Sequence, residues 1–215
     1  MKVFFRISAV LIMAFLLASC QFKVPYDPYT INLHMLAEPR TLNPLTSTDA
    51  YAGSINRYIY ETLLETDNQT LGSKPLLAER WTISKDGMQF TFYLRKNVYW
   101  QDGVKFTAED VLYSYNQIMN PKVDAARLRN YYRDVKMCEK LDDYTIRFTY
   151  KEPYFRALIM LGAIQIIPKH LFDDGTEFNS HRLSRAPIGT GPYKFLEWKT
   201  GREIVLVRDE KYWRK

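Results

Sequence analysis

The chain has 215 residues, of which 47% are hydrophobic and 25% are charged, a balance typical of a globular protein with one or two domains. Its formal net charge of +6 includes no block of Lys or Arg, so the charge pattern argues against a nucleic-acid-binding protein. Two cysteines, Cys20 and Cys138, are too few for a disulfide framework.

Residues 1–19 have the pattern of a secretory signal peptide. Lys2 and Arg6 precede an apolar run of eleven residues, Ile7–Leu17. At about 1.5 Å per residue this run reaches roughly 17 Å, which is too short to span a membrane. The Leu-Ala-Ser before Cys20 resembles the bacterial lipoprotein box, which predicts that Cys20 carries a membrane-anchoring lipid on the periplasmic or outer side. The alternative is a plain signal peptide with an incidental cysteine. Removal of the signal subtracts two positive charges from +6 and leaves +4.

The next part of the chain predicts a tether, a strand, a loop and a helix. Residues 20–29 are polar, hold two prolines and are expected to tether the fold to the lipid. Thr30–Leu36 is predicted to be a short strand. Glu38–Pro44 also holds two prolines, which exclude a helix or a central strand and predict a fixed loop. Asp49 is then positioned to cap a helix with apolar residues at helical spacing.

A hairpin followed by a helix is the clearest unit in the sequence. Asp86-Gly87 separates Trp81–Ser84 from Gln89–Leu94, and Asp-Gly between apolar runs is a strong hairpin signal because Gly adopts positive φ at no steric cost. Thr107 then begins a capping-box pattern with acids in the first turn, and Asn120-Pro121 ends the helix.

The second half of the chain predicts further strands and shorter helices. Residues 122–133 are polar and basic without clear periodicity, which indicates a loop or a weak helix, and residues 172–185 are predicted to be a polar loop. The other predicted elements are a hairpin of Val135–Lys140 with Tyr144–Tyr150, a helix at Tyr154–Leu161, a buried run at Ile164–Ile167, a short helix opened by Pro168, and the strands Tyr193–Trp198 and Glu203–Arg208.

The sequence holds no recognisable motif for catalysis or for a metal ion. The histidines His34, His170 and His181 lack a metal-ligand spacing, and there is no nucleophile-elbow or phosphate-loop motif. Acid pairs such as Asp142-Asp143 fall at predicted turns, where exposure to solvent explains them. The sequence therefore favours binding over catalysis and predicts neither a metal nor a cofactor.

Several short motifs follow one another between residue 30 and the last residue. They include Glu38-Pro39-x-Thr41-Leu42-Asn43-Pro44, Tyr60–Leu64, Leu77-Ala78-Glu79-x-Trp81, Phe106–Val111, Ile167–His170, Gly189–Tyr193 and Tyr212-Trp213. In order and spacing they resemble the family 5 extracellular solute-binding proteins, the peptide-binding subunits of ABC importers. That family has relatives for dipeptides, nickel chelates and some oligosaccharides. One small departure is Asp209, where the family usually has Asn.

The resemblance implies a mixed α/β fold of the type II periplasmic-binding-protein class. Such a protein is a Venus flytrap, in which two lobes close over a ligand and the closed form docks on a membrane permease. Residues 30–45 plus 186–215 would be part of the first lobe, and residues 46–185 a smaller α/β subdomain packed on it. The ligand would be a peptide or a similar small solute, held largely through backbone hydrogen bonds.

The resemblance also implies where the ligand would lie. The loop after residue 37 would form this half's wall of the cleft, since relatives lay the ligand backbone against the equivalent segment. Two tyrosines near residue 131 lie where relatives approach the ligand, with surface aromatics on a weak helix as the alternative. The expected ligand-binding residues are Glu38, Pro39, Arg40, Thr41, Leu42, Tyr131 and Tyr132.

Family members are more than twice as long as this chain, and the resemblance covers only their N-terminal part. The expectation is therefore an incomplete receptor that lacks the second lobe and cannot bind peptide tightly alone: a truncated gene product, a fragment or half of a split receptor. Two other hypotheses stay open. One is a secreted hydrolase, cleaving glycosides or peptides with an unrecognised carboxylate pair, and the other is an interaction module that docks on a permease without carrying solute.

Overall fold

A computed structural model describes residues 27–214 and divides the chain into two parts, residues 1–36 and residues 37–215. The predicted signal peptide (residues 1–19) and Cys20 lie outside the described residues. In the first part, Asp27 Oδ1 accepts a hydrogen bond of 2.9 Å from the Tyr29 N–H in a tight turn, and Thr30–Leu36 is not a strand. The predicted strand is wrong because alternating apolar residues form a strand only where a neighbouring strand takes up their backbone groups.

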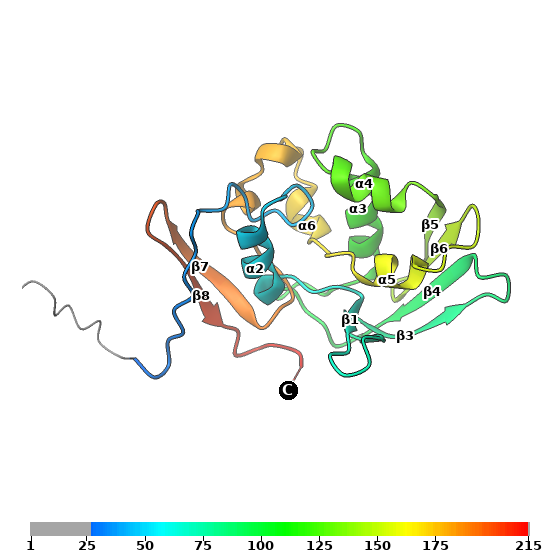
Figure 1. The fold of residues 1–215 in the computed structure, drawn as a ribbon, viewed down its shortest axis with the longest axis horizontal. Helices are drawn as coiled ribbons and strands as arrows, with labels where there is room; N and C mark the ends of the chain where they lie inside the picture. Colours follow the sequence, from blue (N-terminus) through cyan, green and yellow to red (C-terminus); the bar gives the residue numbers. More distant parts are fainter. Residues whose placement is uncertain (1–26, 215) are drawn as a thin grey trace, which may run out of the picture. The chain divides into compact units, whose positions relative to one another are not determined.

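The second part contains helices and strands in mixed order (Figure 1). The helices are α2 (Ala50–Ile59), α3 (Ala108–Met119), α4 (Ala126–Tyr132), α5 (Ala157–Gly162) and α6 (Lys169–Phe172), with short 3₁₀ turns at Phe178–Ser180 and Arg182–Ser184. The strands are β1 (Leu64–Thr66), β2 (Ser73–Pro75), β3 (Ala78–Ile83), β4 (Gln89–Leu94), β5 (Val135–Asp142), β6 (Thr145–Tyr150), β7 (Tyr193–Lys199) and β8 (Glu203–Arg208). The predicted α/β class is confirmed.

A four-stranded antiparallel sheet in the order β3-β4-β6-β5 supports α3 on one face (Figure 1). Both predicted hairpins are confirmed as neighbouring strand pairs, and Phe92 faces Ile146 across the middle of the sheet. The apolar face is buried because alternate residues of β4 and β6 point to α3, where the Tyr115 ring packs edge-on against Phe148. The capping box at Thr107 is also confirmed and fixes the start of α3.

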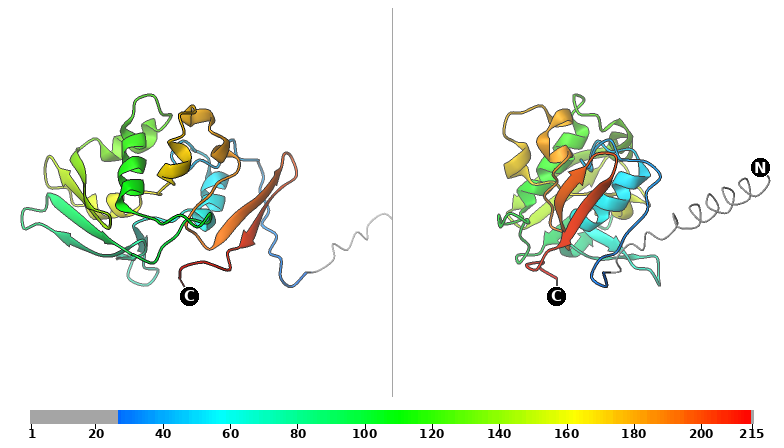
Figure 2. Two further views of the ribbon diagram at one scale, coloured as in Figure 1. Left: turned by 180° about the vertical axis from the view of Figure 1, so that it is seen from behind. Right: turned by 90° about the vertical axis from the view of Figure 1, so that its left-hand side faces the viewer.

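The turn Gly189-Thr190-Gly191 packs against the C-terminal end of α2 and leads into the β7–β8 hairpin (Figure 2). The Gly191 N–H donates to the Ile59 carbonyl at 2.8 Å. A Cβ atom added to Gly189 would lie 1.8 Å from the same carbonyl oxygen, so only glycine fits this close approach. The Gln101 side chain holds the turn from the other side, donating to the Gly191 carbonyl and accepting from the Gly189 N–H.

Two segments that looked irregular in the sequence have defined structure. Within residues 122–133 the weak-helix alternative holds, because α4 forms there and the Arg129 guanidinium donates to three carbonyl oxygens of the preceding segment. The prediction of a polar loop at 172–185 is incomplete. Phe172 and Leu183 are buried there, and the side chain of His181 stacks on Phe172 with ring centroids 4.6 Å apart.

Two absences concern only residues 27–214. No helix in this range is long and apolar enough to cross a membrane. No group of three or more His, Cys, Asp or Glu side chains in this range is arranged to hold a metal ion.

Candidate functional site

A polar pocket of about 290 Å³ lies at the N-terminal end of α2. Three separate parts of the sequence form its wall: the loop before α2 together with the first turns of that helix, the start of α4, and the segment after α5. The lining residues are Pro44, Ser47, Thr48, Asp49, Ala50, Gly53, Asn56, Arg127 and Gln165.

Two buried polar atoms of the pocket wall have no hydrogen-bond partner among the described residues. They are the Ser47 hydroxyl and the Asn56 Oδ1, on side chains of residues that are 8% and 1% exposed. A buried polar atom without a partner costs about 1–3 kcal/mol, so such atoms indicate that something else supplies the missing hydrogen bonds. Both atoms are closed off from the open space of the pocket, whereas the Asp49 and Arg127 side chains of the lining are not fully buried.

Two residues of opposite charge, Asp49 and Arg127, line the pocket. Asp49 caps α2, and its Oδ1 accepts a hydrogen bond of 2.6 Å from the Ala52 N–H. Arg127 extends from α4, and its Nη2 donates to the Ser47 carbonyl at 3.4 Å, which is long for a charged donor. The guanidinium of Arg127 therefore keeps most of its hydrogen-bonding capacity for another group.

The proline-rich loop holds its shape through side-chain and backbone bonds. Asn43 Oδ1 accepts from the Leu45 N–H at 3.0 Å, and the Asn43 N–H donates to the Thr41 hydroxyl at 3.0 Å. The Leu42 N–H donates to the Ser184 carbonyl at 2.7 Å, and the Leu42 side chain is fully buried. The loop is thus fixed, as its two prolines predict, and Leu42 serves the core while the residues after it reach the pocket.

Glu38 anchors the β7–β8 hairpin. Its carboxylate accepts hydrogen bonds from the Trp198 indole N–H and, at 2.9 Å, from the Gly201 N–H in the hairpin turn. Arg185 lies 3.8 Å from the same carboxylate and stacks on the Trp198 ring at 3.7 Å. In this structure the Glu38 side chain is engaged within the fold.

The other expected ligand-binding residues lie in different environments. Pro39 is buried and Arg40 is exposed. Tyr131 is 50% exposed, whereas Tyr132 is buried and its hydroxyl donates to the Met160 carbonyl at 3.0 Å. Burial raises the pKa of Tyr132. None of the residues expected from sequence to bind ligand lines the pocket at α2.

With the exception of Asn56, the pocket residues that sequence reasoning missed carried no local signal. Asn56 is on the inner side of a helix, where a polar residue interrupts the apolar spacing, and Ser47 follows the second proline of the loop. Arg127 belongs to the stretch 122–133, which holds three other basic residues and so hides its separate role. Only the buried, unpartnered Asn56 could have been suspected, as a polar residue between Ile55 and Ile59 on a buried helix face.

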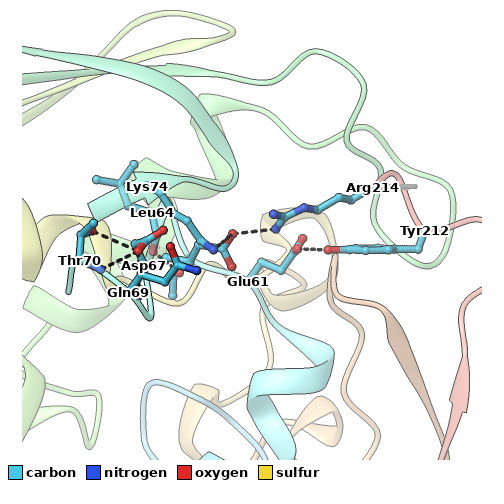
Figure 3. A network of polar contacts seen from close by, with 10 residues as sticks. Glu61, Leu64, Asp67, Gln69, Thr70, Lys74, Tyr212 and Arg214 are labelled. Atoms are coloured by element: carbon cyan, nitrogen blue, oxygen red, sulfur yellow. Dashed lines mark hydrogen bonds and ion pairs between the residues drawn. The ribbon is translucent and has the colours of Figure 1, made fainter. Parts of the chain in front are cut away.

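A second polar cluster joins the C-terminal residues to the segment after α2 (Figure 3). Glu61 is buried, and its carboxylate accepts hydrogen bonds from the Tyr212 hydroxyl at 2.6 Å and from the Trp213 indole N–H at 2.8 Å. Burial raises the pKa of Glu61, against the opposing effect of these hydrogen bonds. Arg214 pairs with Glu65 at 2.8 Å. This cluster fixes residues 212–214 to the segment after α2.

Comparison with known proteins gives one consistent result. The family model described as bacterial extracellular solute-binding proteins, family 5 Middle, matches residues 73–215. The oligopeptide-binding protein AppA of Bacillus subtilis is 32% identical over 186 residues, which cover 82% of this chain and 33% of AppA. The chain thus spans about a third of the length of this curated relative.

Solved structures similar to this chain include two that have a solute bound. One is NikZ from Campylobacter jejuni in complex with Ni(L-His), with a TM-score of 0.75 and 34% identity over 83% of this chain and 35% of NikZ. The other is the periplasmic binding protein DppA from Helicobacter pylori in complex with the peptide STSA, with a TM-score of 0.75 and 33% identity over 82% of this chain and 38% of DppA.

Proposed function

Because the chain belongs to the bacterial extracellular solute-binding proteins of family 5, we propose that it is the substrate-binding component of an ABC importer. It captures peptides or similar small solutes outside the cytoplasmic membrane and delivers them to the permease subunits. Its relatives are described as binding proteins or have a solute bound, so the alternative of a secreted hydrolase finds no support. In this proposal the chain is not an enzyme.

The observation that carries the proposal is the polar pocket at the start of α2. Small-molecule sites are concave and lined by a few polar groups, and here Asp49, Arg127 and Gln165 line one pocket from three segments of the chain. Side chains that donate and accept hydrogen bonds suit a solute that is itself rich in donors and acceptors, as a peptide is.

The loop after residue 37 is still proposed to form a wall of the cleft, but through different groups from those expected. Since the Glu38 and Leu42 side chains are engaged within the fold, the loop would meet a solute through its main chain and through the exposed Arg40. Tyr131 would approach from α4. Residues 30–45 plus 186–215 would belong to one lobe and residues 46–185 to the subdomain packed on it.

The proposed location is the cell envelope. Residues 1–19 would direct export, and a lipid on Cys20 would anchor the protein to a membrane with residues 20–29 as a tether. The fold would then face the periplasm or the cell exterior, where an importer's receptor meets its solute.

Calorimetric titration of the purified chain with mixed tri- to pentapeptides tests the proposal. We expect saturable binding weaker than micromolar, because these 215 residues span about a third of the relatives' length and a two-lobed receptor buries its ligand between both lobes. Absence of any saturable binding would count against solute capture by this chain. Micromolar or tighter binding would instead refute the need for an opposing lobe.

A further inference from the structure

His181 has both ring nitrogens engaged within the segment between α6 and β7. Its Nδ1 accepts a hydrogen bond of 3.2 Å from the Leu183 N–H, and its Nε2 lies 3.2 Å from an oxygen of the Asp174 carboxylate. A ring nitrogen that accepts a hydrogen bond carries no proton, so the ring is neutral in this structure and Nε2 donates to Asp174. The side chain of His181 is fully buried and stacks on the Phe172 ring.

The neutral ring supports the second 3₁₀ turn, Arg182–Ser184, and this turn holds the proline-rich loop (residues 38–44). His181 precedes the turn, and its Nδ1 takes up the Leu183 N–H that the start of a helical turn leaves without a backbone partner. At the end of the turn, the Ser184 carbonyl accepts the hydrogen bond of 2.7 Å from the Leu42 N–H. A titratable side chain is therefore three residues away from a main-chain attachment of the loop.

The charged surroundings of the ring do not themselves change between pH 5 and 8. Asp174 is the only carboxylate within 4.0 Å of a ring nitrogen among residues 27–214, and hydrogen bonds from Thr176 lower the pKa of Asp174 to about 2, so it stays ionised. On α3, burial and the nearby Asp173 and Asp174 carboxylates raise the pKa of Tyr113 to about 12, so this phenol stays neutral. Of these groups, histidine is the one whose charge ordinarily changes in that range. The charged side chains that flank the ring along the chain are exposed to solvent: Asp173, Glu177 and Arg182.

We propose that His181 is an acid-sensitive switch that releases the proline-rich loop when its ring is protonated. Nδ1 takes up one proton from solvent and then faces the Leu183 N–H as a second donor, so the hydrogen bond between them is lost. The ionised Asp174 attracts the positive ring at Nε2 and does not replace the lost acceptor. Because the buried Leu183 N–H loses its side-chain acceptor, the 3₁₀ turn loosens and the Ser184 carbonyl separates from the Leu42 N–H.

The consequence for solute capture rests on the proposed function, in which this loop forms a wall of the cleft. A loop that is fixed by Ser184 presents its main chain in one arrangement, whereas a released loop must be ordered again when a solute binds. Solute affinity would therefore fall as the medium becomes acidic.

Nuclear magnetic resonance of the full chain without any solute tests the switch from about pH 8 to pH 5. The His181 ring signals report its protonation, and hydrogen exchange, corrected for the intrinsic rate at each pH, reports the protection of the Leu183 and Leu42 amides. We expect the protection of both amides to fall about tenfold or more as the ring is protonated, while the amides of α3 keep theirs. A ring that stays neutral until the whole fold unfolds, or a protonated ring with both amides still protected, would overturn the proposal.

Matched variants separate the switch from a purely structural role of the side chain. His181→Asn keeps an oxygen that accepts from the Leu183 N–H, because Asn caps helical turns well, but it cannot be protonated in this range. We expect its Leu183 and Leu42 amides to stay protected from about pH 8 to pH 5. Asp174→Asn removes the charge that favours the positive ring and should move the midpoint of His181 protonation to lower pH.

His170→Asn is the control, because His170 also contacts a carboxylate but is not attached to the 3₁₀ turn. It should lose protection at Leu183 and Leu42 in acid as the wild type does. Acid-dependent loss of protection in His181→Asn, or an unshifted midpoint in Asp174→Asn, would overturn the proposal.

The proposed function and this switch can fail separately, because the switch is measured without a solute. Acid release of the Leu42 amide, with no peptide binding at any pH, supports the switch and counts against solute capture. Peptide binding of unchanged affinity across this pH range, in a chain whose Leu42 amide stays protected, supports solute capture and overturns the switch.

Discussion

The Tyr212 hydroxyl donates a hydrogen bond of 2.6 Å to the buried Glu61 carboxylate, from 151 residues further along the chain (Figure 3). Trp213 adds a second donor to the same carboxylate. Hydrogen bonds to a charged group contribute about 1.5–3 kcal/mol each, so this contact is a main attachment of the C-terminal residues to the segment after α2.

Glu61 predicts a pH dependence of stability. Burial raises its pKa above the ordinary 4.5, so in the range above pH 4.5 the folded chain binds more protons at this site than the unfolded chain. The Glu61 contribution to stability is therefore fully present below pH 4.5 and is lost as pH rises through the folded pKa.

We accordingly expect Glu61→Gln to reduce the loss of unfolding free energy between pH 4.5 and 7 relative to the wild type. Urea unfolding at several pH values measures the free energy of unfolding of the variant and of the wild type. Glu210→Gln, whose side chain is 83% exposed, controls for the loss of one negative charge. Parallel pH profiles for Glu61→Gln and the wild type would contradict the expectation.

Replacement of Glu38 is predicted to loosen the β7–β8 hairpin locally. Glu38→Ala leaves the Trp198 indole and the Gly201 N–H without their acceptor, and we expect a cost of about 1–2 kcal/mol because the carboxylate is partly exposed. Hydrogen exchange at the Gly201 amide should accelerate while exchange within α3 stays unchanged. Uniform acceleration in both places, or none, would be evidence against this anchoring role.

The contact of Gly189 with α2 predicts a large steric effect. Gly189→Ala places a methyl group 1.8 Å from the Ile59 carbonyl oxygen, and the backbone shift required should destabilise the fold by about 3 kcal/mol. Gly53→Ala is the matched control, since nothing lies within 4 Å of its added methyl group and helix propensity favours alanine by about 1 kcal/mol. Thermal unfolding compares the stability of the two variants. Equal stability of Gly189→Ala and Gly53→Ala would show that Gly189 is not tightly packed.

We predict that a lipid attached to Cys20 anchors the protein to the membrane. In a bacterial host, the wild-type chain should partition into detergent and carry a lipid mass, whereas Cys20→Ala should lose both. Cys138→Ala is the control, because Cys138 lies in β5 and burial raises the pKa of its thiol, which makes it unreactive. Recovery of unmodified wild-type chain from the membrane fraction would refute lipid attachment at Cys20.

The elements that the sequence predicted well have their determinants close together in the chain. The Asp86-Gly87 hairpin and the helix after Thr107 depend on turn and cap residues within a few positions of each other. Thr30–Leu36 failed as a strand because a strand also needs a neighbour, which is a long-range property. The buried side chains in residues 172–185 were missed for the same reason, since Phe172, Phe178 and Leu183 are spaced too widely for any local period.

The candidate site was less accessible to sequence reasoning than the fold. The resemblance pointed to the segment around Glu38 and Thr41, whose role in the fold depends on contacts with Trp198 and Ser184 far along the chain. The pocket combines Ser47, Asn56 and Arg127 from three segments, and no motif links those segments. Only the folded arrangement shows that these residues line one pocket.

The most direct test of the account is a resonance titration of the chain with trialanine, read at the backbone amides of α2 and at Arg127. The account predicts saturable shifts at Ala52, Gly53 and Asn56 and at the Arg127 side chain, with the outer face of the β3-β4-β6-β5 sheet unchanged. Saturable shifts confined to surfaces away from α2, or none at all, would contradict the claim that this pocket is a wall of the solute site.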